Sequence, residues 1–189
     1  MTMSNRFHAP TIGAGLALVL CQFTGCACNQ PAAEPEVAAP PPPNIQAWMD
    51  RLTVAHEYDP ETGFIVAREV VDLPPLLRDA PPLERSVEQG RREGRPVVVF
   101  ATADRCAPCQ QFKRDALNDP IVIRRLASTG WIATHVEVDR EHDAAVRILG
   151  SAGIPVTYLI VDGQVVDRLP GQRSAKELLD WISTPRTKS

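Results

Sequence analysis

The chain has 189 residues, of which 44% are hydrophobic and 23% are charged, enough apolar sequence for at least one packed domain. Its formal net charge at pH 7 is −3, and no basic patch is interleaved with aromatic residues. This balance argues against nucleic acid as the main partner.

Residues 1–25 have the pattern of an export signal. Arg6 provides a weakly positive start, and residues 11–23 (TIGAGLALVLCQF) form an apolar run that is short for a bilayer span. The stretch FTGC, which ends at Cys26, resembles the lipidation site of bacterial lipoproteins. The resemblance implies a periplasmic protein with lipid on Cys26 at a membrane surface, and Ala27 in the next position favours the outer membrane. Ordinary signal cleavage without lipid is the alternative.

Residues 26–44 are predicted to be a tether. Proline, alanine and glutamate dominate residues 29–44 (NQPAAEPEVAAPPPPN), a composition that cannot bury a core. Such a segment is stiff and extends by about 3.1 Å per residue, so it would hold a domain away from its anchor. Cys28 within it is a lone thiol if Cys26 carries lipid, either inert or available for an intermolecular disulfide.

Residues 45–82 form an N-terminal extension with weaker signals. Apolar residues at helical spacing after Asn44 predict a short helix that Asn44 caps. Residues 63–71 (GFIVAREVV) predict a strand. The proline-rich residues 72–82 predict neither a helix nor a strand.

The pattern becomes regular from Leu83. Residues 83–92 predict a polar helix that Gly94 ends, and the continuous apolar run at 96–101 predicts a central strand covered on both faces. A helix is expected from about Pro108. Asp119-Pro120, an N-cap followed by a first-turn proline, begins a second helical piece that runs to Thr129.

The second half of this region continues the alternation of strands and helices. Residues 131–138 predict a strand, and residues 141–149 predict a helix that stops at Gly150. Ser174 and Glu177 form a capping box that opens the last helix.

A hairpin lies between these helices. Residues 156–161 and 165–169 flank Asp162-Gly163, a strong turn signal. A hairpin is antiparallel, whereas helical crossovers join parallel strands, so residues 83–185 are predicted to form one α/β domain with a mixed sheet.

Two cysteines lie where the central strand meets the next helix. Cys106 falls at the helix start, where unpaired amides point outwards and favour the thiolate, the reactive form of the residue. Arg105 adds a neighbouring cation. Cys109 follows one turn later, where it can attack a mixed disulfide on Cys106, and Pro108 fits the first turn without losing a hydrogen bond.

Three roles for this pair compete. As a structural staple, a disulfide across so short a loop would restrict the unfolded chain little. As a metal site, the pair needs two more ligands, and the chain has no second CxxC and only histidines scattered in sequence, His56, His135 and His142 among them. The redox role needs only the pair itself. We therefore expect no metal and no cofactor beyond the redox-active Cys106–Cys109 disulfide.

The stretches VVVFATADRCAPCQQFK (97–113) and AGIPVTYLIVDGQVVDRLPG (152–171), followed by an amphipathic helix, resemble the thioredoxin superfamily. The resemblance covers roughly residues 83–183. It implies a thioredoxin fold, in which helices flank a central mixed β-sheet on both faces. It also implies that Cys106 is the attacking cysteine and Cys109 the resolving one.

The same resemblance implies a substrate groove. Ile154-Pro155 would be a cis peptide bond facing the two sulfurs, and the backbone of Ile154 would pair with an extended substrate peptide. Gly171 would leave room beside the active site. Ala107-Pro108 between the cysteines resembles reducing members of the family more than strong oxidants.

Two positions depart from thioredoxin itself. Arg105 replaces the tryptophan that precedes the first active-site cysteine, which removes an apolar contact surface and adds charge. Phe100 stands where thioredoxin has a buried acid that helps to take the proton of the second cysteine. Another group or water must then accept that proton, or Cys109 loses it more slowly.

The sequence thus predicts an exported, lipid-anchored thiol:disulfide oxidoreductase that reduces protein disulfides. Its expected partners are protein disulfide substrates, a membrane reductase as electron donor and the membrane surface, and the protein is expected to be a monomer. A copper-handling module, with thiolates as soft ligands, and a non-catalytic chaperone or binding module are the alternatives.

Overall fold

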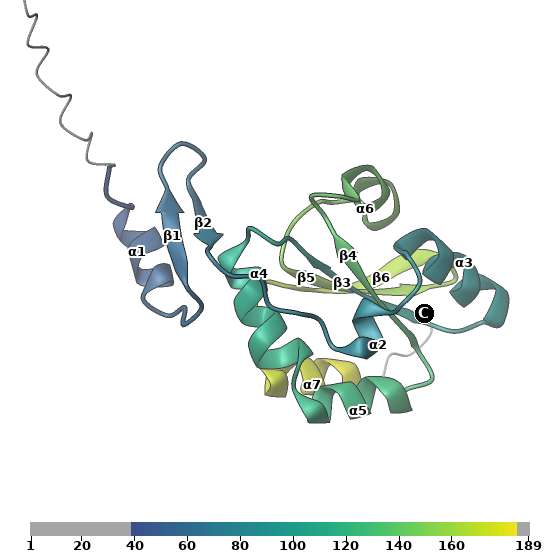
Figure 1. Ribbon diagram of the computed structural model, residues 1–189. Helices are drawn as coiled ribbons and strands as arrows, with labels where there is room; N and C mark the ends of the chain where they lie inside the picture. Colours follow the sequence, from purple (N-terminus) through teal and green to yellow (C-terminus); the bar gives the residue numbers. More distant parts are fainter. Residues whose placement is uncertain (1–38, 185–189) are drawn as a thin grey trace, which may run out of the picture. The chain divides into compact units, whose positions relative to one another are not determined.

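A computed structural model describes residues 39–184 (Figure 1). Residues 1–38 and 185–189 lie outside the described residues. The predicted export signal, the lipidation site at Cys26, the lone Cys28 and most of the predicted tether fall in that part of the chain.

A mixed four-stranded sheet forms the centre of the structure. Its strands are β3 (Val97–Thr102), β4 (Ile132–Glu137), β5 (Val156–Val161) and β6 (Gln164–Pro170), in the order β4-β3-β5-β6. β3 runs parallel to β4 and antiparallel to β5, and β5 and β6 form the predicted antiparallel hairpin. The hairpin turns at Asp162 and Gly163, both with positive φ (52° and 79°), as this tight turn requires.

Helices cover both faces of this sheet (Figure 1). All six residues of β3 are buried, and alternate residues enter two separate apolar clusters. One cluster includes residues of α3 (Leu83–Glu93) and α6 (His142–Leu149). The other includes residues of α4 (Ala107–Phe112), α5 (Pro120–Ser128) and α7 (Ala175–Ser183). The central position predicted for this strand is therefore confirmed.

Local end signals place the helices as predicted. Gly94 and Gly150 end α3 and α6 in the left-handed conformation. The Asp119 side chain accepts hydrogen bonds from two amides at the start of α5, and Ser174 and Glu177 form the predicted capping box of α7.

The helix predicted from about Pro108 is interrupted. It begins at Ala107 as α4 and continues as a π-helical turn at Lys113–Leu117, labelled η1. The Asn118 amide donates to the Lys113 carbonyl oxygen, 3.0 Å away, across five residues. This wider turn is not visible in the apolar spacing, because five-residue and four-residue bonds leave similar patterns over so short a segment.

The N-terminal extension differs from its prediction in three ways. The first helix, α1 (Pro43–Met49), begins one residue before Asn44, so Asn44 lies inside it and Pro42 occupies the cap position without a side-chain bond. Proline is well suited to a first turn because it lacks the amide that would stay unpaired there. The predicted N-cap role of Asn44 is therefore wrong.

The other two differences concern short elements. The predicted strand at 63–71 is shorter, β2 (Phe64–Ala67), and it pairs with β1 (His56–Asp59), which the sequence pattern did not reveal. The proline-rich segment contains a four-residue helix, α2 (Pro75–Arg78). Both elements are too short for periodicity to identify.

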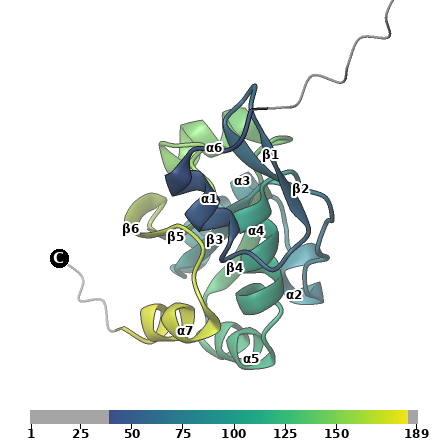
Figure 2. The ribbon, with the colours of Figure 1, turned by 90° about the vertical axis from the view of Figure 1, so that its left-hand side faces the viewer.

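Contacts with α4 hold the extension on the domain, beside that helix in two views (Figures 1 and 2). Leu52 and Val54 form an apolar cluster with Ala107, which lies between the two cysteines. The buried Gln111 side chain accepts hydrogen bonds from the amides of Thr53 (2.9 Å) and Val54 (3.1 Å). The extension is thereby anchored directly behind the CxxC turn.

Candidate redox site

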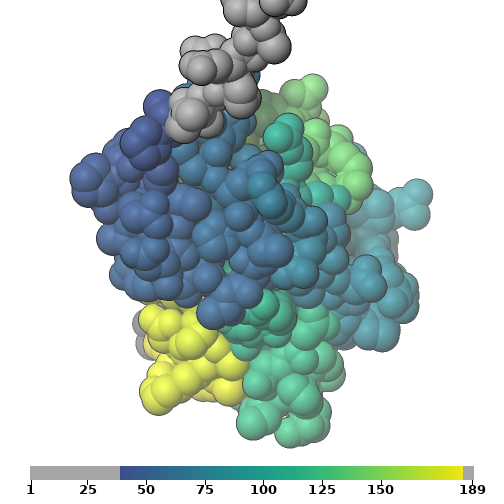
Figure 3. Space-filling model, turned by 60° about the vertical axis from the view of Figure 1, so that its left-hand side comes forward, coloured from purple at the N-terminus to yellow at the C-terminus, as the bar shows by residue number. Residues whose placement is uncertain are grey.

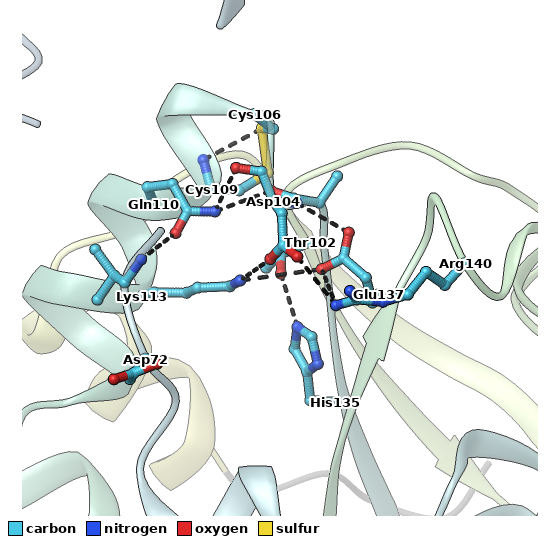
Figure 4. Close-up of polar contacts among 12 residues, drawn as sticks. Asp72, Thr102, Asp104, Cys106, Cys109, Gln110, Lys113, His135, Glu137 and Arg140 are labelled. Atoms are coloured by element: carbon cyan, nitrogen blue, oxygen red, sulfur yellow. Dashed lines mark hydrogen bonds and ion pairs between the residues drawn. A yellow bond between two sulfur atoms is a disulfide. The ribbon is translucent and has the colours of Figure 1, made fainter. Parts of the chain in front are cut away.

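Cys106 and Cys109 form a disulfide at the start of α4 (Figure 4). Cys106 is the N-cap residue, and its Sγ accepts a hydrogen bond from the Cys109 amide, 3.2 Å away. Cys109 is completely buried, whereas Cys106 is partly exposed. An incoming group therefore reaches the sulfur of Cys106 first.

The first turn of α4 provides one backbone donor to the Cys106 sulfur, the Cys109 amide. Ala107 and Pro108 occupy this turn, and Pro108 has no amide that would need a partner there. In the reduced state, the amide dipoles at this helix end favour a negative sulfur on Cys106. Arg105, which precedes the pair, is exposed and adds a positive charge beside the site.

The predicted cis peptide bond between Ile154 and Pro155 is present. Val156 pairs with Ala101, so Pro155 lies at the end of the sheet from which β3 leads towards Cys106. The Gly171 amide donates to the Pro155 carbonyl oxygen, 2.8 Å away. Gly171 has a φ of 82°, and an added Cβ would meet nothing within 4 Å, so its backbone conformation and not crowding requires glycine.

The β1–β2 hairpin adjoins the nucleophilic turn, an arrangement that sequence reasoning missed. Val66 of β2 forms an isolated bridge with Cys106, and the Ala67 amide donates to the Arg105 carbonyl oxygen at 2.8 Å. The backbone leading into Cys106 is thus held by a strand about 40 residues earlier in the chain. No local pattern signals such a contact, because it depends on how two separate segments dock.

An ionic cluster with two buried members, Lys113 and Glu137, lies beneath the cysteine pair (Figure 4). Lys113, whose side chain is 3% exposed, places Nζ 3.1 Å from Asp104 Oδ1 and 4.0 Å from Glu137 Oε2. Arg140 Nη2 lies 3.0 Å from Asp104 Oδ2, and the Asp104 amide donates to Glu137 Oε1 at 2.9 Å. Two carboxylates and two cations therefore balance each other next to the turn that leads to Cys106.

The two carboxyl groups of this cluster shift in opposite directions. Burial raises the pKa of Glu137, and the nearby Asp104 charge adds to that effect, although the Asp104 amide bond and the two cations oppose it. Burial alone would also raise the pKa of Asp104, but the hydrogen bond from Lys113 and the charges of Lys113 and Arg140 lower it below the ordinary value. Glu137 is therefore the carboxyl that holds a proton more readily.

Phe100 is fully buried and packs against Phe112, with ring centroids 6.3 Å apart. Its position on β3 holds no acid, as the sequence indicated. The acidic groups that the structure places near Cys106 come instead from the segment after β3 and from the end of β4.

The three histidines among the described residues do not gather at the site. His135 lies on β4, with Nε2 2.7 Å from Thr102 Oγ1, and burial lowers its pKa to about 4, helped by the charge of Lys113. His142 is exposed at the start of α6, and His56 lies on β1. Among residues 39–184, no group of three or more His, Cys, Asp or Glu side chains is arranged to hold a metal ion.

Residues 80–163 match the family model described as thioredoxin-like. Together with the mixed sheet, this match confirms the expected thioredoxin fold, and the chain contains a thioredoxin-like domain that carries the Cys106–Cys109 pair.

Curated relatives share this region. The chain is 34% identical over 121 residues to the thiol:disulfide interchange protein DsbD of Escherichia coli K12, an alignment covering 64% of this chain and 19% of the relative. DsbD of Shigella flexneri matches with the same identity and coverage. The chain thus spans about a fifth of the length of these relatives.

Similar solved structures include thioredoxin from Thermus thermophilus, with a TM-score of 0.46, 28% identity and coverage of 53% of this chain and 81% of that one. The oxidised C-terminal domain of Neisseria meningitidis DsbD has a TM-score of 0.45 and 25% identity, covering 52% of this chain and 89% of that one. Within the described part of the chain, none of the helices has the length and apolar character needed to cross a membrane.

Proposed function

We propose that the protein is an exported thiol:disulfide oxidoreductase that reduces disulfides in other proteins. The observation that carries the proposal is the Cys106–Cys109 disulfide, with one partly exposed cysteine at a helix start and one buried cysteine a turn behind it. Its similarity to curated relatives named thiol:disulfide interchange proteins supports the same chemistry.

The reaction begins with the reduced pair. The Cys106 thiolate attacks one sulfur of the substrate disulfide, forming a mixed disulfide and releasing the other substrate sulfur as a thiolate. Cys109 then loses its proton and attacks the Cys106 sulfur. The Cys106–Cys109 disulfide forms, the second substrate sulfur leaves as a thiolate, and two electrons have passed to the substrate.

The surrounding residues serve these two steps. The amides of the α4 start and the Arg105 charge stabilise the Cys106 thiolate both as attacking group and as leaving group. Ile154, Pro155 and Gly171 form the groove in which an extended substrate peptide lies. Phe100 cannot accept a proton, so the proton of Cys109 leaves to water or to another group.

The oxidised pair must be reduced again before the next cycle. A dithiol donor supplies the two electrons, and we assign this role to a membrane reductase. The Ala107-Pro108 dipeptide favours reduction of substrates over their oxidation. Lipid on Cys26 and the proline-rich tether would keep the domain in the periplasm, near such a donor and within reach of substrates.

Trapping the mixed disulfide tests this proposal. In Cys109→Ser, attack by Cys106 proceeds but resolution does not, so disulfide-linked partner proteins should accumulate and peptide mapping should place the link at Cys106. The matched control is Cys106→Ser with Cys109→Ser, which should accumulate no links in the domain. If Cys109→Ser forms no link at Cys106, and the reduced wild-type protein leaves insulin unreduced, the proposal is wrong.

A further inference from the structure

A surface pocket of about 390 Å³ lies between α1 and the segment that joins β6 to α7. Trp48, Arg51 and Leu52 line it on one side, and Gln172 and Arg173 line it on the other. Figure 2 shows α1 beside the end of β6 and above α7, and Figure 3 shows the surface of the extension meeting that of α7 on this face.

Both walls of this pocket are connected to the redox site. Leu52 belongs to the apolar cluster that contains Ala107, the residue after Cys106. Gln172 directly follows Gly171, whose amide binds the Pro155 carbonyl oxygen. The pocket therefore adjoins the segments that support both the CxxC turn and the cis-proline.

The pocket presents an aromatic surface and a cation. Trp48 is 41% exposed, and the Arg51 guanidinium carbon lies 5.7 Å from the centroid of its ring. Arg51 Nε donates to the Ala47 carbonyl oxygen at 3.1 Å. Among the described residues, the two terminal nitrogens of Arg51 have no hydrogen-bond or ion-pair partner, so they keep donors for a carboxylate.

The other charged groups of the pocket already have partners. The Asp115 carboxylate binds Arg114 Nε at 3.1 Å and also the Gln111 side chain. The Glu177 carboxylate accepts from the amide and hydroxyl of Ser174 in the α7 capping box. Arg173 binds the Pro170 carbonyl oxygen and lies 3.5 Å from Glu177. Arg51 is thus the lining cation with donors to offer.

We propose that this pocket is a subsite for the polypeptide segment that flanks the disulfide attacked by Cys106, and that Arg51 and Trp48 receive an acidic side chain of that segment. The inference rests on the proposed reductase function and adds a substrate preference to it. It also gives the N-terminal extension a role, because Trp48 of α1 and Arg51, two residues after the end of that helix, lie outside the thioredoxin-like fold.

Two synthetic peptides test the subsite. Each carries one intramolecular disulfide, and they differ only in having glutamate or glutamine beside the cysteines. With the reduced full-length protein, we expect kcat/KM to be about threefold higher for the glutamate peptide, because an exposed ion pair contributes a free energy of that size. The difference should lie in KM, because the ion pair acts on binding of the peptide. High salt should reduce this preference because it screens exposed charges.

Variants assign the preference to the pocket. In Arg51→Gln, the kcat/KM values for the two peptides should become equal. Comparing the two peptides on one variant cancels any general change in cysteine reactivity, because such a change affects both values alike. Arg92→Gln removes the same charge from α3, where the side chain is 69% exposed and does not line the pocket, and it should keep the wild-type ratio.

Two failures are distinguishable. If the wild-type protein reduces both peptides equally, or if Arg51→Gln keeps the preference, the subsite is wrong while the reductase function stands. If the wild-type protein fails to reduce either peptide and also fails with 2-hydroxyethyl disulfide, a small uncharged substrate, the proposed function itself is overturned.

Discussion

His135 should make the folded domain sensitive to mild acid. Burial first, and then the charges of Lys113 and Arg140, lower its pKa from 6.5 to about 4, while Asp104 opposes them. The folded state therefore binds fewer protons on His135 than the unfolded state between these two values. The contribution of His135 to stability is complete above about pH 6.5 and is lost as the pH falls towards 4.

The size of this effect follows from the two pKa values. With 6.5 in the unfolded chain and about 4 in the folded one, the linkage relation gives a loss of about 2 kcal/mol between pH 7 and pH 5. Glu137, whose pKa burial raises, changes stability in the opposite direction over this range. The effect of His135 is therefore measured by comparing the change in unfolding free energy of the wild-type protein with that of a His135 variant.

The assay is urea unfolding of the oxidised protein at pH 7 and pH 5. His135→Gln keeps an amide that can bond to Thr102 but takes up no proton, so its loss of unfolding free energy should be smaller than that of the wild type by about 2 kcal/mol. His142→Gln, at an exposed position on α6, should keep the wild-type loss. Equal losses in the wild type and in His135→Gln would refute the reasoning.

Two further substitutions test how the extension and α3 are attached. Gln111→Ala leaves the amides of Thr53 and Val54 without their acceptor, so we expect the free energy of unfolding to fall by about 1–3 kcal/mol and amide hydrogen exchange at these two residues to become faster. Unchanged protection of these amides from exchange would contradict the anchoring role of Gln111. Gly90→Ala would place Cβ 2.5 Å from Val97 Cγ2 and 2.8 Å from the Arg95 carbonyl oxygen. The free energy of unfolding should fall by about 1–3 kcal/mol and the melting temperature with it, although alanine favours helices. A higher melting temperature would show that α3 and β3 can move apart without cost.

The core of the fold could be predicted because its signals are local. The apolar run of β3 indicated a strand covered on both faces, and the Asp119 and Ser174 caps marked where helices begin. Each of these signals acts through a residue's own backbone conformation or its nearest neighbours. The redox pair was equally visible, because two cysteines one helical turn apart share a helix start whatever surrounds them.

The surroundings of that pair depended on the tertiary structure. Lys113 is buried at the start of the π-helical turn, and its partners Asp104 and Glu137 come from other elements. The bond between Ala67 and Arg105 likewise joins segments far apart in the sequence, as does the pocket between α1 and the start of α7. The elements and the reactive residues could be predicted because periodicity and end signals are properties of single segments. Docking of those segments decided which charges, strands and surfaces face the cysteines, because such contacts form only when distant parts of the chain pack together.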